Sequence, residues 1–515
     1  MAVVATCMLI GSGVLAGTGA ASSPRAARVT APKLIAHDVS GFAGKTKHAT
    51  ARRGPQIYKA HNDSVASDSD PFVLNPTGDI GRTQYVYAQN GEYWVDSRVN
   101  NALLAGVGSA GFWSGLGGSP EADLCSTDLQ GEPSIAYDQL NDRWVIAEAA
   151  YAGGASPVAP FVECVAVSTG PDATGTWARY VFSVSDTLFP NRPTLGIWSD
   201  GYYLSFNQHT AGGTWAGAGA LALQSSQMLL GLPAQSRYFD DAGFTPRLGG
   251  MLPANVNGPT APDPGAPELY LQAHDDPLNQ HDRLEVWQFD VDWTVGGSSS
   301  FTPVINIPTN GLGGFDVDTE FWCTNPADVS TLWSTCLLQR LGLGSPQLQS
   351  LAQAYTDKPL GPYICSSACD TLPQLGGRLQ WNSTGGTQTL TAVETVNDGA
   401  NIAAPAWFKL TNPGSSWAIG AQGVYDPMDG SSRFLPSVAL DNSGNVGLGY
   451  ALTGPDGPPD PITGVPTPIR HETALGYADA TNPGAYGDRI MVNGSGPYAH
   501  GDTWGRYTTL SLDPI

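Results

Sequence analysis

One group of chemically capable side chains lies near the end of the chain, in the stretch YAHGDTWGRY. Asp502 can orient His500 as a general base there, and Arg506 can pair with a ligand carboxylate. The indole of Trp504 can stack on a sugar ring, and Tyr507 joins it as a substrate-binding candidate. The alternative is a structural joint, in which the rings pack between sheets, the arginine pairs with a neighbouring carboxylate and the histidine is simply exposed.

A second polar cluster, AHDDPLNQHDRLE, has the composition of a hairpin tip. Neighbouring His and Asp side chains can act as base and orienter or as metal ligands, so His274 and Asp276 are further catalytic candidates. The spacing matches no metal-binding motif, and a solvated loop is the alternative. We also assign Tyr203 and His209, on the returning limb of a repeated hairpin, to substrate binding.

The sequence FDVDTE places three carboxylates at alternate positions, Asp316, Asp318 and Glu320. On a strand all three would point to one face, with successive side chains roughly 6.5–7 Å apart. That arrangement suits a metal site, with Ca²⁺ as the cofactor candidate, or an acid and base pair. A solvated strand face is the alternative. The chain holds no GxSxG, HExxH or P-loop motif, so it gives no support to the enzyme classes that those motifs mark.

The elements that must position these residues are repeated β-hairpins. EPSIAYDQLNDRWVIAEAA, RPTLGIWSDGYYLSFNQH and LPSVALDNSGNVGLGYAL each combine an apolar limb, an Asp-containing corner and a second apolar limb. GRYTTLSLDPI begins the same pattern again at the end of the chain. We interpret Asp138, Asp200 and Asp441 as turn residues, because Asp side chains cap tight turns.

Composition and repeat spacing together predict the fold class. The chain has 63 Gly, 40 Pro and only 14% charged residues, which suits an all-β protein rich in tight turns. Similar hairpin pairs recur every 40–60 residues or so, the spacing of four-stranded blades. We expect a single β-propeller of six or seven blades, with seven favoured. Each blade must bury both faces against its neighbours, which explains the repeated apolar limbs.

The stretch GPDATGTW, residues 170–177, resembles a degenerate Asp-box of the sialidase-like propellers. With GEPSIAYDQLNDRW, LGIWSDGYYLSFN, LGGRLQW, VALDNSGNVGLGY and WGRYTTLSLDP, the order of motifs is similar to that of exported bacterial β-propeller proteins of unsettled function. The resemblance implies the fold and says little of activity. This chain departs from the group's pattern at Glu132 and Arg506, where the group carries Asp, so a cation site implied at the second position is in doubt.

The cysteines indicate disulfides. Seven cysteines less Cys7, which lies in the N-terminal apolar run, leave an even number, as expected in an exported chain. We expect three disulfides, with Cys125–Cys164 as the first pair. The other four cysteines lie in one insertion, at about 316–372. Zinc is the rival interpretation, and the sequence offers no pair of CxxC motifs for it.

The N-terminus predicts export. An apolar run followed by small residues suggests a signal peptide over 1–21, without the usual basic start. Residues 22–75, rich in Ala, Ser, Pro and basic residues, are expected to form a flexible linker, and 76–515 the propeller. The first 60 residues hold eight Lys and Arg against one Asp, in a chain whose net charge is −22. The acidic body disfavours nucleic acid as a partner, and no stretch is long and apolar enough to span a membrane.

These features leave two functional classes. The first is a secreted propeller, extracellular or periplasmic, that binds or degrades extracellular glycan, as a hydrolase or lyase if it is catalytic. Its partner would be a polysaccharide or glycoconjugate bound near the central channel. The second is a non-catalytic surface or matrix protein that binds through the same face. The fold alone does not choose between them.

Overall fold

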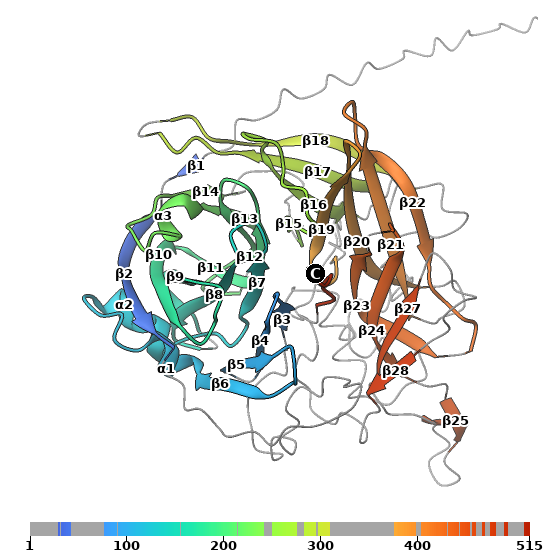
Figure 1. The fold of residues 1–515 in the computed structure, drawn as a ribbon, viewed down its shortest axis with the longest axis horizontal. Helices are drawn as coiled ribbons and strands as arrows, with labels where there is room; N and C mark the ends of the chain where they lie inside the picture. Colours follow the sequence, from blue (N-terminus) through green and yellow to red (C-terminus); the bar gives the residue numbers. More distant parts are fainter. Residues whose placement is uncertain are drawn as a thin grey trace, which may run out of the picture.

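The computed structural model describes residues 29–30, 32–42, 77–309, 375–453 and 509–514, with short gaps in the long ranges, and four strands between 456 and 492. Most of these residues form antiparallel strands, in six consecutive units of four (Figure 1). The first unit is β3 (Thr77–Ile80), β4 (Gln84–Gln89), β5 (Glu92–Ser97) and β6 (Leu103–Gly108). The second is β7 (Ser134–Asp138), β8 (Arg143–Ala152), β9 (Val158–Ser168) and β10 (Thr176–Ser185).

The remaining units follow in chain order. The third is β11 (Leu188–Ile197), β12 (Tyr202–Thr210), β13 (Trp215–Leu223) and β14 (Ser236–Asp240). The fourth is β15 (Leu252–Val256), β16 (Glu268–His274), β17 (Arg283–Asp290) and β18 (Ser300–Pro308). The fifth is β19 (Leu379–Thr384), β20 (Thr387–Asn397), β21 (Ala403–Asn412) and β22 (Ala418–Val424). The sixth is β23 (Ser432–Leu440), β24 (Val446–Thr453), β27 (Ala474–Asp479) and β28 (Arg489–Val492).

Seven further elements lie outside these units. They are β1 (Val29–Thr30), β2 (Lys33–Gly41), the pair β25 (Asp456–Pro459) and β26 (Pro466–Pro468), and three helices, α1 (Ser109–Trp113), α2 (Pro120–Thr127) and α3 (Ser225–Met228). No helix in the described part of the chain is long and apolar enough to cross a membrane.

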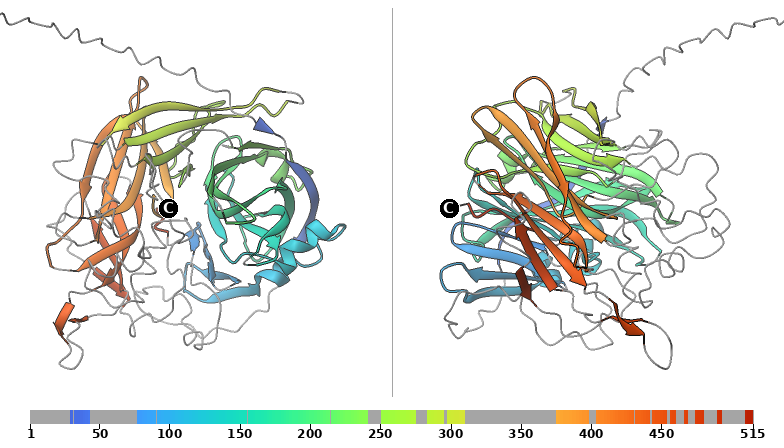
Figure 2. Two further views of the ribbon diagram at one scale, coloured as in Figure 1. Left: turned by 180° about the vertical axis from the view of Figure 1, so that it is seen from behind. Right: turned by 90° about the vertical axis from the view of Figure 1, so that its right-hand side faces the viewer.

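The six units are arranged as the blades of a β-propeller. The first strand of each unit contacts the first strand of the next, from β3 through β7, β11, β15 and β19 to β23, and β15 also pairs with β19 in parallel. These strands surround the point where the C-terminus lies, and the later strands of each unit lie farther out (Figures 1 and 2). The prediction of an all-β propeller is confirmed. The described residues contain six blades, and the number for the whole chain stays a prediction.

The repeated hairpins are the inner strand pairs of three blades. The three sequence repeats form β7–β8, β11–β12 and β23–β24, each an antiparallel ladder. Their aspartates lie at the corners as predicted. Asp138 Oδ1 accepts hydrogen bonds of 3.0 Å from the backbone N–H groups of Leu140 and Asn141, and Asp441 Oδ1 accepts one of 2.8 Å from Ser443 N. The stretch GPDATGTW forms the turn between β9 and β10.

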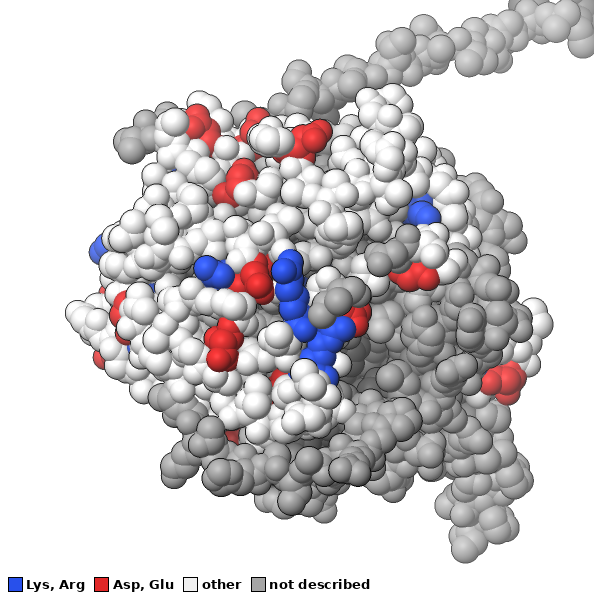
Figure 3. All heavy atoms as spheres, viewed as in Figure 1, with Lys and Arg blue, Asp and Glu red and all other residues white. Residues whose placement is uncertain are grey.

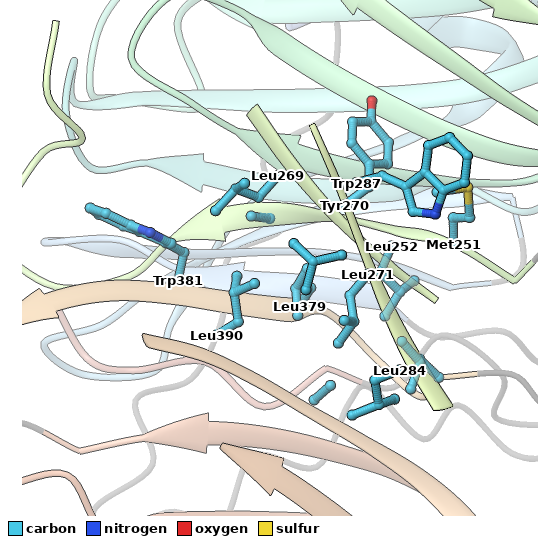
Figure 4. Packing of buried hydrophobic residues seen from close by; sticks show 14 of the residues in the cluster. Met251, Leu252, Leu269, Tyr270, Leu271, Leu284, Trp287, Leu379, Trp381 and Leu390 are labelled. Carbon is cyan, nitrogen blue, oxygen red and sulfur yellow. The ribbon is translucent and has the colours of Figure 1, made fainter. Parts of the chain in front are cut away.

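Apolar seams between blades form the core. The largest cluster joins the third, fourth and fifth blades and includes Tyr270, Trp287 and Trp381 (Figure 4). Trp198 packs edge-on against Trp381 with ring centroids 5.1 Å apart. Because a blade is covered on both faces, its strands are apolar on both sides, as the long apolar limbs in the sequence require.

The predicted disulfide between Cys125 and Cys164 is confirmed. It joins α2 to β9, with Cα atoms 5.9 Å apart, and both cysteines are fully buried. Ser119 caps α2 through a hydrogen bond from Ala122 N, and Pro120 begins the helix, as expected for an N-terminal turn. The other four cysteines, in the insertion expected at about 316–372, lie outside the described residues.

The N-terminal segment corrects one expectation. Residues 29–41, which we placed in a flexible linker over 22–75, contain β1 and β2. β1 pairs with β14 of the third blade, and β2 adds a fifth strand to the second blade by pairing with β10. The composition of 22–75 concealed these strands because their stability comes from the partner strands and not from strong local alternation. The predicted signal peptide over 1–21 lies outside the described residues.

A buried arginine holds β2 in place. Arg179 on β10, only 3% exposed, donates to Asp38 on β2 through Nε at 2.9 Å and through a second nitrogen at 2.5 Å. The same guanidinium donates to the carbonyl of Ser114 at 3.1 Å and to that of Phe112. Removing the carboxylate would leave a buried cation with neutral partners only, which is costly.

We therefore expect Asp38→Ala to lower the free energy of unfolding by about 2–3 kcal/mol. The control is Asp513→Ala, which breaks an ion pair with Arg98 at a side chain that is 47% exposed, and it should cost under about 1 kcal/mol. Urea denaturation followed by tryptophan fluorescence measures both. Equal losses in the two variants would show that β2 is not held by this pair.

Candidate functional site

A small polar hollow of about 30 Å³ lies at the end of the channel where the inner strands begin. Its polar lining comes from Arg192 and Thr194 on β11 and from Ser205 and Asn207 on β12. Apolar groups complete it, among them Met251 and Leu252 at the start of the fourth blade, with Leu375 and Gly377 from the segment before β19. A concave site of mixed apolar and convergent polar groups is the usual form of a small-molecule site.

A bulge in β11 presents Arg192 to this hollow. The pairing of β11 with β12 shifts between Asn191 and Thr194. Arg192 within this shift has a φ of +59°, the left-handed region that non-glycine residues seldom adopt. Bulges of this kind re-aim side chains, and residues held in rare conformations cluster at functional sites. Here the backbone takes Arg192 out of the regular ladder at the mouth of the channel.

Hydrogen bonds fix the other wall of the hollow. Gly250 N donates to Asn207 Oδ1 at 2.9 Å, and Ser205 Oγ donates to the carbonyl of Met251 at 2.5 Å. Both bonds cross from the third blade to the fourth. The lining is therefore held by side chains already bound to the neighbouring blade, which preorganises the site.

The charge of the hollow contrasts with that of the chain. Among the described residues that line it, Arg192 is the only charged one, whereas the whole chain carries a net charge of −22. The guanidinium is always protonated and presents a planar fork of donors. The arrangement can bind an anionic group and hydrogen-bond the hydroxyls beside it.

The C-terminal segment, residues 509–514, lies at the opposite end of the channel, where it lines a second, smaller hollow with Asp79 and Arg378. Thr509 Oγ1 donates to the Gly78 carbonyl at 2.6 Å, and Gln380 Nε2 donates to the Leu510 carbonyl at 3.2 Å. In Figure 2 the C-terminus lies at the side of the molecule that faces the viewer in Figures 1 and 3. Figure 3 shows Lys and Arg side chains gathered near the middle of that face. A ligand would therefore reach the Arg192 hollow from the other side.

Two buried carboxyls lie in the second blade, on β8 and β9. Leu195 N donates to Ser134 Oγ at 3.1 Å, which sets β7 next to β11. Glu148 on β8 accepts from Gly131 N at 3.1 Å and from the Tyr93 hydroxyl. Burial raises the pKa of Glu148 to about 7, and the charge of Glu132 adds to the effect.

Glu163, on the adjacent strand, is the more isolated of the two. Its side chain is fully buried, and neither carboxyl oxygen has a hydrogen-bond partner among the described residues. Burial raises the pKa of Glu163 well above its ordinary value, with a further contribution from the Glu148 charge. Both groups therefore hold a proton more tightly in the folded protein than in the unfolded chain.

Of the predicted site residues, His209 and Tyr203 both lie on β12, which lines the hollow. His209 pairs with Phe189 on β11, two cross-strand pairs beyond Asn191 and Asn207, and its side chain is buried. Tyr203 lies at the other end of β12, where it is fully buried, donates to Asp200 Oδ1 at 2.9 Å and packs against Phe289. The structure therefore places Tyr203 in the core and not at a surface that a substrate reaches.

The other predicted site residues have side chains outside the part of the chain that the structure describes. His274 is the last residue of β16, and its side chain lies outside the described residues. Also outside them are Asp276, the carboxylates Asp316, Asp318 and Glu320, and the C-terminal cluster of His500, Asp502, Trp504, Arg506 and Tyr507. Their roles stay predictions. In the part of the chain that the structure describes, no three His, Cys, Asp or Glu side chains are grouped to hold a metal ion.

The sequence held signals for the residues that we missed. Arg192 begins one of the repeated hairpins, at the position before its proline. Glu148 is a lone carboxylate in the apolar limb RWVIAEAA, and Glu163 is another in VECVAVS. A charged residue inside a buried strand marks either a buried partner or a functional group. The bulge that turns Arg192 into the hollow has no such signal.

Comparisons with known proteins give distant likenesses only. No family model matches the chain, and no curated protein does. The solved haemagglutinin-neuraminidase of parainfluenza virus 5 with the ligand DANA is similar at 11% identity and a TM-score of 0.36, over 77% of this chain and 90% of that one. A PL25 ulvan lyase matches at 11% identity and 0.31, over 79% and 81%. An endo-arabinase from Bacteroides thetaiotaomicron matches at 12% identity and 0.27, over 66% and 92%.

The buried carboxyls predict a pH dependence of stability. A carboxyl whose pKa is higher in the folded protein than in the unfolded chain makes the free energy of unfolding fall as the pH rises. For Glu148 the fall runs from its ordinary pKa of 4.5 to about 7 and amounts to about 3 kcal/mol. Glu148→Gln, which keeps the shape and removes the charge, should reduce the loss of stability between pH 5 and pH 8 by that order.

Glu163→Gln should likewise reduce the loss of stability between pH 5 and pH 8, because burial also raises the pKa of Glu163. The control is Glu121→Gln on α2, an exposed carboxyl whose pKa is lowered by a hydrogen bond to Ser119 and which titrates below this range. Urea denaturation at pH 5 and pH 8 measures all three variants. If the Glu148 and Glu163 variants lose as much stability with rising pH as the wild type, the buried carboxyls do not govern it.

Proposed function

We propose that this chain is a secreted β-propeller that binds an acidic extracellular glycan at the Arg192 hollow. One observation carries the proposal: a single guanidinium is the only charge in the described lining of a concave polar site, in a strongly acidic chain. A polyanion that is repelled by much of the acidic surface would find an attractive group at this channel mouth.

The lining groups match the chemistry of an acidic sugar. The guanidinium of Arg192 can pair with a carboxylate through two parallel hydrogen bonds. The Thr194 hydroxyl and the Asn207 amide are suited to sugar hydroxyls, and Met251 and Leu252 offer an apolar wall to the C–H groups of the ring. A uronic acid residue within a polysaccharide combines these features.

Binding is better supported than catalysis at this hollow. Its described lining contains a cation, an amide and two hydroxyls, and no carboxylate or imidazole to transfer a proton. A hydrolase or lyase activity would depend on the predicted groups outside the described residues, above all His500, Asp502 and Arg506, or His274 and Asp276. A Ca²⁺ ion at Asp316, Asp318 and Glu320 belongs to the same set of proposals.

Export is supported by the covalent structure. The fully buried disulfide Cys125–Cys164 is of a kind that persists in oxidising compartments outside the cytosol. We therefore propose a secreted protein, extracellular or periplasmic, whose partner is a polysaccharide or glycoconjugate. A non-catalytic surface or matrix protein that binds through the same hollow is the form that the described groups favour.

The test is a binding screen against acidic and neutral polysaccharides with three proteins: the wild type, Arg192→Gln and Arg82→Gln. Arg82 is the matched control, since it is exposed and lies in the β3–β4 turn at the other end of the channel. We expect binding to uronic-acid polysaccharides only, weakened at least tenfold by Arg192→Gln and unchanged by Arg82→Gln. Reducing-end and unsaturated-uronate assays on the same samples report turnover. Full binding by Arg192→Gln, or no binding to any acidic glycan, would refute the proposal.

A further inference from the structure

A partly exposed aromatic ring lies next to the Arg192 hollow. Phe189 is the second residue of β11, three residues before Arg192, and it pairs with His209 on β12. Asn191 and Asn207 form a cross-strand pair two positions farther along, toward the hollow. Phe189 therefore belongs to the same end of the same two strands that supply the polar lining.

Three buried rings support Phe189 from two blades. His209 stacks on it with ring centroids 5.3 Å apart and an angle of 20° between the planes. Tyr151 and Phe161, from the second blade, lie at 5.3 Å and 6.0 Å. These three side chains are buried, whereas Phe189 keeps part of its surface exposed. The ring is thus held rigidly with an apolar surface left toward solvent.

Packing between the blades does not by itself require the Phe189 ring to be partly exposed. In the first three blades the other phenylalanines of the described seams are buried, among them Phe112, Phe182 and Phe206. A fixed aromatic surface beside convergent polar groups suits the C–H face of a pyranose ring, since rigid aromatic rings supply contact area at little entropic cost. Phe189 and Arg192 lie three positions apart on β11, so their Cα atoms are at most about 10 Å apart.

We propose that Phe189 is a stacking platform for a second sugar residue, beside the one whose acidic group pairs with Arg192. The ligand would then be an acidic oligosaccharide and not a free uronic acid, with one ring on Phe189 and the carboxylate of the neighbouring ring at Arg192. The inference rests on the proposed function and adds the requirement that the ligand contain at least two sugar residues. His209, expected at the outset to contact substrate, acts instead as a positioning residue behind the platform.

The test measures affinity against chain length. Isothermal titration calorimetry with oligogalacturonates of one to six residues, or with the acidic series that the screen selects, compares the wild type with Phe189→Leu and Phe189→Trp. We expect a marked gain in affinity from one residue to the longer chains in the wild type. Phe189→Leu should abolish most of that gain and so lower the affinity for the longer chains at least tenfold. Phe189→Trp should retain the gain. Val158→Ala, an exposed apolar change at the start of β9, is the control and should change nothing.

The outcomes separate this inference from the proposed function. If Phe189→Leu binds long and short chains as the wild type does, the platform is refuted while Arg192 binding stands. If Arg192→Gln binds as the wild type does, the proposed function fails whatever Phe189 does. Saturation-transfer NMR on the wild type gives a check independent of folding in the variants. Transfer from the aromatic resonances to the C–H protons of a bound tetrasaccharide is expected, and its absence would contradict stacking.

Discussion

One buried ion pair at the centre of the propeller ties together blades that are far apart in the sequence. Arg378, just before β19, donates to Asp79 of β3 at 2.6 Å, and the two side chains are 3% and 7% exposed. Arg378 also donates to the Ile135 carbonyl, and Asp79 accepts from Tyr137 N at 2.8 Å. The first, second and fifth blades thus meet at two side chains. Apolar seams tolerate small shifts between blades, whereas a buried pair does not, since breaking one costs about 3–5 kcal/mol.

This centre divides the channel into two unlike ends. On one side the C-terminal segment occupies the space among the inner strands, held by bonds to Gly78 and Gln380. On the other side the chain leaves a hollow lined by Arg192 and Asn207. Every group that we propose to bind glycan lies at the Arg192 end of the channel.

The fold could be predicted from sequence because its strongest local signals agree with the global structure. An Asp-containing corner between apolar limbs specifies a hairpin, and the hairpins at Asp138, Asp200 and Asp441 formed as expected. The strand β2 could not be predicted, because its pairing is with β10, over 130 residues away. Arg192 was missed because its role depends on a bulge and a positive φ, which no residue pattern encodes. Our sequence criteria favoured clusters of polar residues in loops, whereas this site consists of single residues brought together from separate strands.

The most direct test of the account is a crystal structure of the protein with an acidic tetrasaccharide selected by the binding screen. The account predicts a carboxylate paired with the Arg192 guanidinium in the hollow beside Asn207, with the neighbouring sugar ring lying against Phe189. A tetrasaccharide bound at the end occupied by residues 509–514, or on the outer rim of the blades with the hollow empty, would contradict it.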